Sequence, residues 1–170
     1  MDSPTNEMAG REIVITRVFD APRELVWKAW TEPERLMRWW APDGCSSPFC
    51  TVDLRPGGVF LYCMRMPDGR DIWGKGVYRE IVEPERIVYI DAFADAQGNT
   101  VSPTYYGMSE DHPMETQVTV TFDEQGGRTR LVLRHSVPES FPEREGTMQG
   151  WTQMLNKLAE ELTKHEGGAA

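Results

Sequence analysis

The chain has 170 residues, which fits a single domain because one hydrophobic core usually serves about 100–200 residues. Its formal net charge at pH 7 is −9, which argues against a nucleic-acid partner, since nucleic-acid-binding domains normally carry a basic patch. Hydrophobic residues make up 39% of the chain and include six Trp and nine Met. These large, adaptable side chains suit either an ordinary core or the lining of a cavity, and composition alone favours the core.

The ends of the chain are polar or rich in small residues. We expect residues 1–10 and 167–170 to be disordered, and residues 11–166 to form one domain. The first ten residues lack the basic and apolar regions of a signal peptide, and no run approaches the roughly 18 apolar residues of a membrane span. We therefore expect a cytoplasmic protein without membrane insertion.

Cysteine usage indicates free thiols. Cys45, Cys50 and Cys63 are odd in number, form no CxxC motif and have no His at a zinc-finger spacing. We expect all of them to be reduced, as in a reducing compartment, and to bind no metal. The sequence also lacks phosphate-binding and dinucleotide-binding glycine motifs, so we expect no cofactor.

The folded part opens with a strand and short helices. Residues 11–19 are rich in β-branched residues and predict a strand. Asp20 and Pro22 are helix-start signals, and residues 22–30 place apolar residues on one helical stripe. Residues 32–39 repeat this pattern and predict a second helix, which ends at Pro42-Asp43-Gly44.

The next part of the chain alternates with a period of two, which predicts a run of strands. Turn-forming residues separate most of them, so neighbouring strands should pair antiparallel. The predicted strands are 50–54, 59–66, 71–82, 86–93, 115–122 and 129–136. Residues 94–114 form a long polar loop, which we expect to be a mobile flap that gates one end of the sheet.

A long helix is predicted over residues 143–165. Met148, Trp151, Leu155, Leu158 and Leu162 recur at spacings of three and four and form one apolar stripe. The element order is therefore β-α-α-β6-α, an α+β fold. We expect a curved seven-stranded antiparallel sheet wrapped around this helix, the helix-grip fold, with an apolar cavity between sheet and helix.

Several stretches resemble a known family. They are "VFDAPRELVWKAWTEPERLMRWWAP", "DLRPGGVF", "MPDGRDIWGKGVYREIVEPERIVY" and "GWTQMLNKLAEEL". The chain resembles the START-like (SRPBCC) superfamily and, within it, proteins similar to the C-terminal domain of the activator of heat-shock protein 90 ATPase. The resemblance implies a helix-grip fold with a cavity and usually no metal or tightly held cofactor. It does not imply chaperone activation, because that activator has a further N-terminal domain.

Strand parity predicts which residues face the cavity. Because Arg65 should point outward, Tyr62 and Met64 should point inward; Trp73 is placed inward with Val77 and Ile81. The candidate ligand-binding residues on the sheet and the long helix are Tyr62, Met64, Trp73, Phe93, His135, Met148, Trp151 and Leu155. Any of them could equally be ordinary core residues.

A few polar residues could carry chemistry. His135 could bind a ligand's polar group or act as a base, although an inert hydrogen-bonded histidine is the simpler interpretation. Asp91 shares the parity of Tyr89 and Phe93; we expect it at an exposed edge, and if buried it would be a general-base candidate. The Trp39-Trp40 pair could stack on a flat ligand or close the end of the sheet.

The leading hypothesis is a non-catalytic protein that binds a small hydrophobic molecule in its interior. The alternatives are an enzyme of the cyclase or hydrolase type that uses His135, Asp91 or Tyr62 in the same cavity, and a module that contacts a chaperone. We expect the chain to be a monomer or a weak homodimer.

Overall fold

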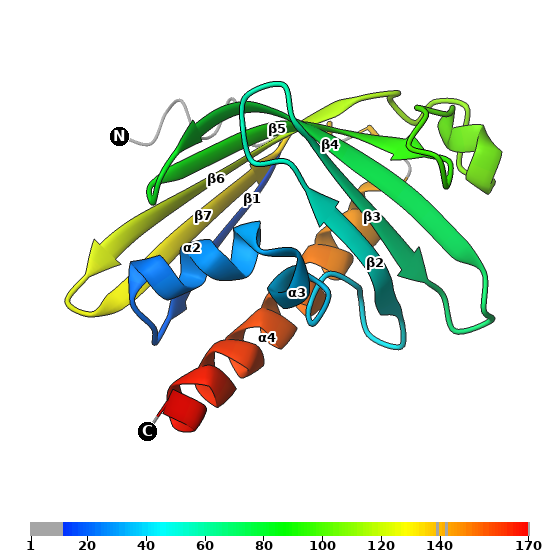
Figure 1. Cartoon of the computed structure of the whole chain (residues 1–170). Helices are drawn as coiled ribbons and strands as arrows, with labels where there is room; N and C mark the ends of the chain where they lie inside the picture. Colours follow the sequence, from blue (N-terminus) through cyan, green and yellow to red (C-terminus); the bar gives the residue numbers. More distant parts are fainter. Residues whose placement is uncertain (1–11, 139, 142, 170) are drawn as a thin grey trace.

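The computed structural model describes residues 12–169 except 139 and 142. Its centre is a single seven-stranded antiparallel sheet that arches over the helices (Figure 1). The strands are β1 (Ile13–Phe19), β2 (Ser46–Val52), β3 (Val59–Arg65), β4 (Asp71–Val82), β5 (Arg86–Ala94), β6 (Thr116–Gln125) and β7 (Arg128–His135). The helices are α2 (Arg23–Thr31), α3 (Pro33–Leu36), the short 3-10 turn η1 (Pro103–Tyr106) and α4 (Arg144–Ala169). The predicted helix-grip fold is confirmed.

The strand order is β1-β7-β6-β5-β4-β3-β2, so the first two strands occupy opposite edges of the sheet. The chain crosses between these edges through α2 and α3, which lie under the arch beside α4 (Figure 1). From β2 to β7 each strand pairs antiparallel with the next strand in sequence. All of these connections except the long one between β5 and β6 are too short for a parallel crossover.

Most boundaries agree with the sequence pattern, and the differences have local causes. The edge strand β2, predicted at 50–54, lies at Ser46–Val52 and is irregular between Ser46 and Phe49, because Pro48 has no N–H to donate. The predicted helix over 32–39 is only one turn, after which Trp39 and Trp40 turn into the core. The β6–β7 hairpin closes more tightly than predicted, since Gly126 and Gly127 adopt positive φ in a two-residue turn.

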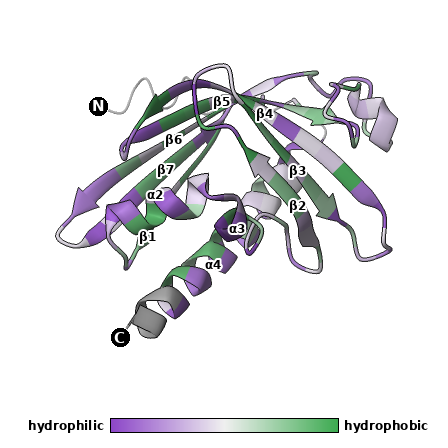
Figure 2. Cartoon of the chain, in the orientation of Figure 1, coloured by the Kyte–Doolittle hydropathy of each residue, from purple (hydrophilic) through white to green (hydrophobic). Residues whose placement is uncertain are grey.

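The long helix extends to Ala169, through residues predicted to belong to a disordered tail. The expected disorder of residues 1–10 lies outside the described residues. Among the described residues, no helix is long and apolar enough to span a bilayer. In Figure 2 hydrophobic and hydrophilic residues occupy different sides of α4, as expected for a helix packed under a sheet.

The core is an aromatic cluster where the three helices meet the sheet. Trp30 of α2 stacks on Trp151 of α4 at a centroid distance of 6.2 Å, and Trp40 contacts both edge to face. The Trp39 indole N–H donates to the carbonyl of Ala29 at 3.0 Å, which fixes α3 against α2. These large rings fill the core where α2 and the segment after α3 meet α4.

Candidate functional site

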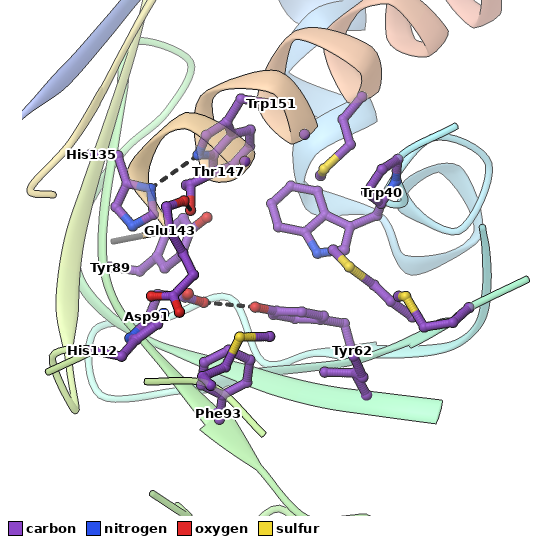
Figure 3. Close-up of a pocket in the computed structure, with 18 residues that line it drawn as sticks. Trp40, Tyr62, Tyr89, Asp91, Phe93, His112, His135, Glu143, Thr147 and Trp151 are labelled. Carbon is purple, nitrogen blue, oxygen red and sulfur yellow. Dashed lines mark hydrogen bonds between the residues drawn. The ribbon is translucent and has the colours of Figure 1, made fainter. Parts of the chain in front are cut away.

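A cavity of about 390 Å³ lies under the arch of the sheet (Figure 3). It lies between the inner faces of β3, β4 and β5, the N-terminal half of α4 and the long loop after β5. Its lining residues are mostly aromatic or sulfur-containing and include Trp40, Tyr62, Met64, Met66, Tyr89, Asp91, Phe93, Met108, His112, His135, Glu143, Thr147, Trp151 and Met154. A cavity of this size and composition is typical of small-molecule sites.

Two glycines in the middle of β4 make room for the rings that form the cavity wall. A Cβ atom at Gly74 would lie 2.4 Å from the Tyr62 ring, and one at Gly76 would lie 2.6 Å from the Tyr89 ring. Real Cβ atoms do not approach other heavy atoms so closely. Gly74 and Gly76 therefore let Tyr62 and Tyr89 lie across the neighbouring strand.

Tyr62 and Asp91 form the polar centre of the cavity. The Tyr62 hydroxyl donates a hydrogen bond of 2.8 Å to Oδ1 of Asp91, from β3 across β4 to β5 (Figure 3). Burial raises the pKa of the Asp91 carboxyl to about 7, although the hydrogen bond from Tyr62 acts in the opposite direction. Burial and the neighbouring carboxyl raise the pKa of Tyr62 well above its ordinary value, so the phenol stays protonated. The expectation that Asp91 lies at an exposed edge is wrong: it is partly buried in the cavity wall.

His135 is fixed by hydrogen bonds on both ring nitrogens. The Trp151 indole N–H donates to Nδ1 at 3.0 Å (Figure 3). The other ring nitrogen, Nε2, lies 2.8 Å from the Thr116 hydroxyl. Because an indole can only donate, Nδ1 must be the acceptor and Nε2 carries the proton. Burial, with a smaller contribution from His112, lowers the pKa of His135 to about 4. His135 is therefore a neutral imidazole with both nitrogens occupied.

Two ionisable residues from connecting segments also line the cavity: His112 in the long loop and Glu143 just before α4. One oxygen of Glu143 accepts from the backbone N–H of Ser109 at 3.3 Å, while its other oxygen is buried without a partner among the described residues. The His112 ring packs edge to face on Phe141, with centroids 4.4 Å apart, and its Nδ1 donates to the Pro113 carbonyl at 3.0 Å. These contacts place two titratable groups beside the mouth.

The long loop is also attached to the outer edge of the cavity. The Tyr106 hydroxyl accepts from the backbone N–H of Trp73 at 3.1 Å and donates to the carbonyl of Ala94. Tyr105, in contrast, is 63% exposed. Met108 and His112 extend from this loop into the cavity wall. The loop is thus positioned to cover the cavity, and its gating motion stays a prediction.

The predicted site residues divide into two groups. Tyr62, Met64, Phe93, His135 and Trp151 line the cavity. Trp73, Met148 and Leu155 do not.

Trp73 was assigned to the wrong face of β4. Its ring lies beside Phe49 on the outer side of the sheet, at a centroid distance of 5.3 Å. The error has a structural cause: a bulge between Tyr78 and Glu80 reverses the alternation, so that Ile81 reaches the core although Trp73 shares its parity.

Met148 and Leu155 of α4 do not line the cavity, for two different reasons. Met148 is 38% exposed and lies on the outer side of α4, so its predicted inward orientation is wrong. Thr147 and Trp151, four residues apart, take the cavity face instead. Leu155 is fully buried, but it packs in the aromatic core below the cavity.

Sequence reasoning missed Tyr89, Met108, His112, Glu143 and Thr147 as lining residues. The alternate glycines of β4 were an available signal, since glycine on the inner face of a strand marks a place where another group approaches closely. No comparable signal marks the loop residues, whose positions depend on tertiary contacts.

The charge of the lining is acidic. Asp91 and Glu143 belong to it, whereas no Lys or Arg does among the described residues.

The described residues contain no group of three or more His, Cys, Asp or Glu side chains that could hold a metal ion. Burial also raises the pKa of the Cys50 thiol to about 12 and that of Cys63 to about 11, which favours the protonated thiols at neutral pH.

Comparison with solved structures supports the fold over nearly the whole chain. A protein from Nitrosomonas europaea is 26% identical with a TM-score of 0.75, and the match covers 94% of this chain and 98% of that one. A protein from Arthrobacter aurescens is 26% identical with a TM-score of 0.78, over 92% of this chain and 88% of the other. The AHSA1 protein from Silicibacter pomeroyi shares the fold at 21% identity and a TM-score of 0.71, over 91% and 99% of the two chains.

No curated protein sequence matches the chain. A protein-family model does match, over residues 20–163, which include both short helices, β2 to β7 and most of α4. Its description is activator of Hsp90 ATPase homolog 1-like protein. The match confirms the resemblance found in the sequence motifs. The chain therefore belongs to the family of activator of Hsp90 ATPase homolog 1-like proteins.

Proposed function

We propose that this chain binds a small, largely apolar molecule in the cavity between β3, β4, β5 and α4. The observation that carries the proposal is the composition of the cavity: about 390 Å³ lined by aromatic and sulfur-containing side chains, with the Tyr62–Asp91 pair at its centre. Apolar walls provide affinity by removing ligand surface from water, and a small number of fixed polar groups provide orientation. The family membership supports a binding role without indicating the ligand.

An apolar fluorescent probe tests this proposal. We expect the native protein to bind the probe, and Met64→Trp to weaken binding at least about tenfold by filling the cavity. Met148→Trp is the matched control, since it makes the same substitution on the outer side of α4. Equal binding by the native protein and both variants would place the probe outside the cavity. A native protein that ignores the probe would refute the proposal.

A second candidate function is acid–base catalysis in the same cavity. One observation favours it: a carboxyl whose pKa is about 7 and which is hydrogen-bonded to a phenol can both accept and return a proton near neutral pH. Asp91 would be the general base and Tyr62 the group that orients it. The test is whether a ligand recovered from the native protein is converted on incubation, and whether Asp91→Asn abolishes conversion while binding persists.

Contact with a chaperone, and a state that is either a monomer or a weak homodimer, remain predictions from the sequence. The cavity lies under the sheet and provides no evidence for either one. Analytical ultracentrifugation of the native chain, alone and mixed with a purified chaperone, tests both predictions.

A further inference from the structure

We propose that the cavity prefers a ligand with an apolar body and a cationic amine at its polar end over an otherwise identical carboxylic acid or alcohol. This inference rests on the proposed binding function and names the class of ligand. It is based on the charge, the hydrogen-bonding capacity and the ring surfaces of the lining side chains.

The charged lining residues are both acidic. Asp91 projects from β5 and Glu143 from the residue just before α4, so their carboxyl groups approach the cavity from two walls (Figure 3). The basic residues of α4 nearest to it are engaged elsewhere. Lys157 donates to the carbonyls of Ala41 and Pro42 at 2.7 and 3.0 Å, and Arg144 donates to the carbonyl of Glu12 at 3.0 Å. The field in the cavity therefore favours a cation.

Both carboxyl groups retain acceptor capacity. The buried Oε1 of Glu143 has no partner among the described residues, and Tyr62 binds only Oδ1 of Asp91. An ammonium group carries three donors and no acceptor, which complements this arrangement. Charge-assisted hydrogen bonds of this kind are about twice as strong as neutral ones. A bound amine would thus satisfy polar groups that the protein alone leaves incompletely paired.

The donors that a carboxylate would need are mostly in use. Tyr62 donates to Asp91 and Trp151 donates to His135, whose own Nε2 proton faces the Thr116 hydroxyl. The Trp40 indole N–H has no partner among the described residues, but one neutral donor does not offset the repulsion from two carboxylates. An anionic ligand would therefore enter with unpaired charge.

The aromatic rings of the cavity wall also favour a cationic ligand. The rings of Trp40, Tyr62, Tyr89, Phe93 and Trp151 line the cavity. The face of an aromatic ring carries partial negative charge and attracts ammonium groups, most strongly where water is excluded. Rings and carboxylates together provide a site in which a cation is stabilised from several sides.

Isothermal titration with decylamine, decanol and decanoate, each below its micelle-forming concentration, tests the preference. The three probes share one chain and differ in the charge of the head group. At about pH 8, where an unperturbed histidine is neutral, we expect decylamine to bind at least about tenfold tighter than decanol, and decanoate to bind more weakly than decanol. Asp91→Asn and Glu143→Gln should each reduce the ratio of amine to alcohol affinity several-fold, with the alcohol affinity nearly unchanged.

Matched controls separate the cavity from the overall charge. Asp123→Asn and Glu145→Gln remove the same charge at exposed positions outside the cavity, and we expect the ratio of the native protein in both. If the three probes bind equally, if decanoate binds best, or if the control variants lower the ratio as much as Asp91→Asn does, the charge inference is overturned while the binding function stands. If none of the three probes binds, the proposed function itself falls.

Discussion

Asp91 and His135 face the same cavity, and their pKa values are shifted in opposite directions. The pKa of Asp91 is raised from 3.8 to about 7 and that of His135 is lowered from 6.5 to about 4, because burial favours the neutral form of each group. Between the unfolded and folded pKa values of Asp91, the folded protein retains a proton that the unfolded chain has lost. Between the folded and unfolded pKa values of His135, the folded protein lacks a proton that the unfolded chain has gained. The Asp91 contribution to stability is therefore lost as pH rises, and the His135 contribution is lost as pH falls.

Replacing Asp91 should expose the first of these two trends. We expect the free energy of unfolding of Asp91→Asn, relative to the native protein, to improve by about 2 kcal/mol between pH 5 and pH 8, since water in the open cavity reduces the full effect of the shift. Asn can still accept the Tyr62 hydrogen bond, so the change isolates the charge. Urea titrations over this pH range measure it, with Asp123→Asn as control. A difference that does not vary with pH would show that Asp91 titrates normally.

At the scale of elements, β4 decides whether the cavity can exist. Its inner face has no side chain at positions 74 and 76, and the rings of β3 and β5 occupy that space. Tyr62 cannot swing away freely, because it packs against Trp40 and Phe60 and donates to Asp91. Gly74 and Gly76, which look like a weakness in the interior of a strand, are therefore required for the cavity wall that Tyr62 and Tyr89 form.

Gly74→Ala should be destabilising although alanine is the smallest possible addition. We expect a loss of about 1–3 kcal/mol, because a Cβ 2.4 Å from the Tyr62 ring must displace that ring from a packed position. Gly146→Ala on α4 is the matched control: its Cβ would meet open space, and alanine should stabilise the helix by roughly 0.5–1 kcal/mol. Denaturant titration compares the two. Equal effects would mean that Tyr62 relaxes without cost.

The sequence was sufficient for the architecture and for only part of the site. Turn residues and periodicity predicted all seven strands and the helices α2, α3 and α4, because each of these signals is local, but they did not predict the 3-10 turn η1 inside the long loop. The orientation of Trp73 could not be predicted, since the bulge near Tyr78 depends on pairing with β5. Met148 was assigned to the cavity face because it continues the spacing of the apolar stripe, but the small residues Gly146 and Thr147 occupy that face at the start of α4. His112 and Glu143 lie in two different connecting segments, before β6 and before α4, whose courses follow from tertiary contacts.

At the scale of the whole molecule, Trp151 joins the layers. It stacks on Trp30 of α2, meets Trp40 edge to face and donates to His135 of β7, while its own helix forms one wall of the cavity. We expect Trp151→Ala to lower the free energy of unfolding by roughly 3–5 kcal/mol, because a large void would form beside rings that cannot collapse and His135 would lose its donor. Met148→Ala, three residues earlier on the exposed side of α4, should cost less than about 1 kcal/mol. Urea unfolding followed by circular dichroism measures both values. A loss below about 1 kcal/mol for Trp151→Ala would show that the sheet and α2 hold together without this contact.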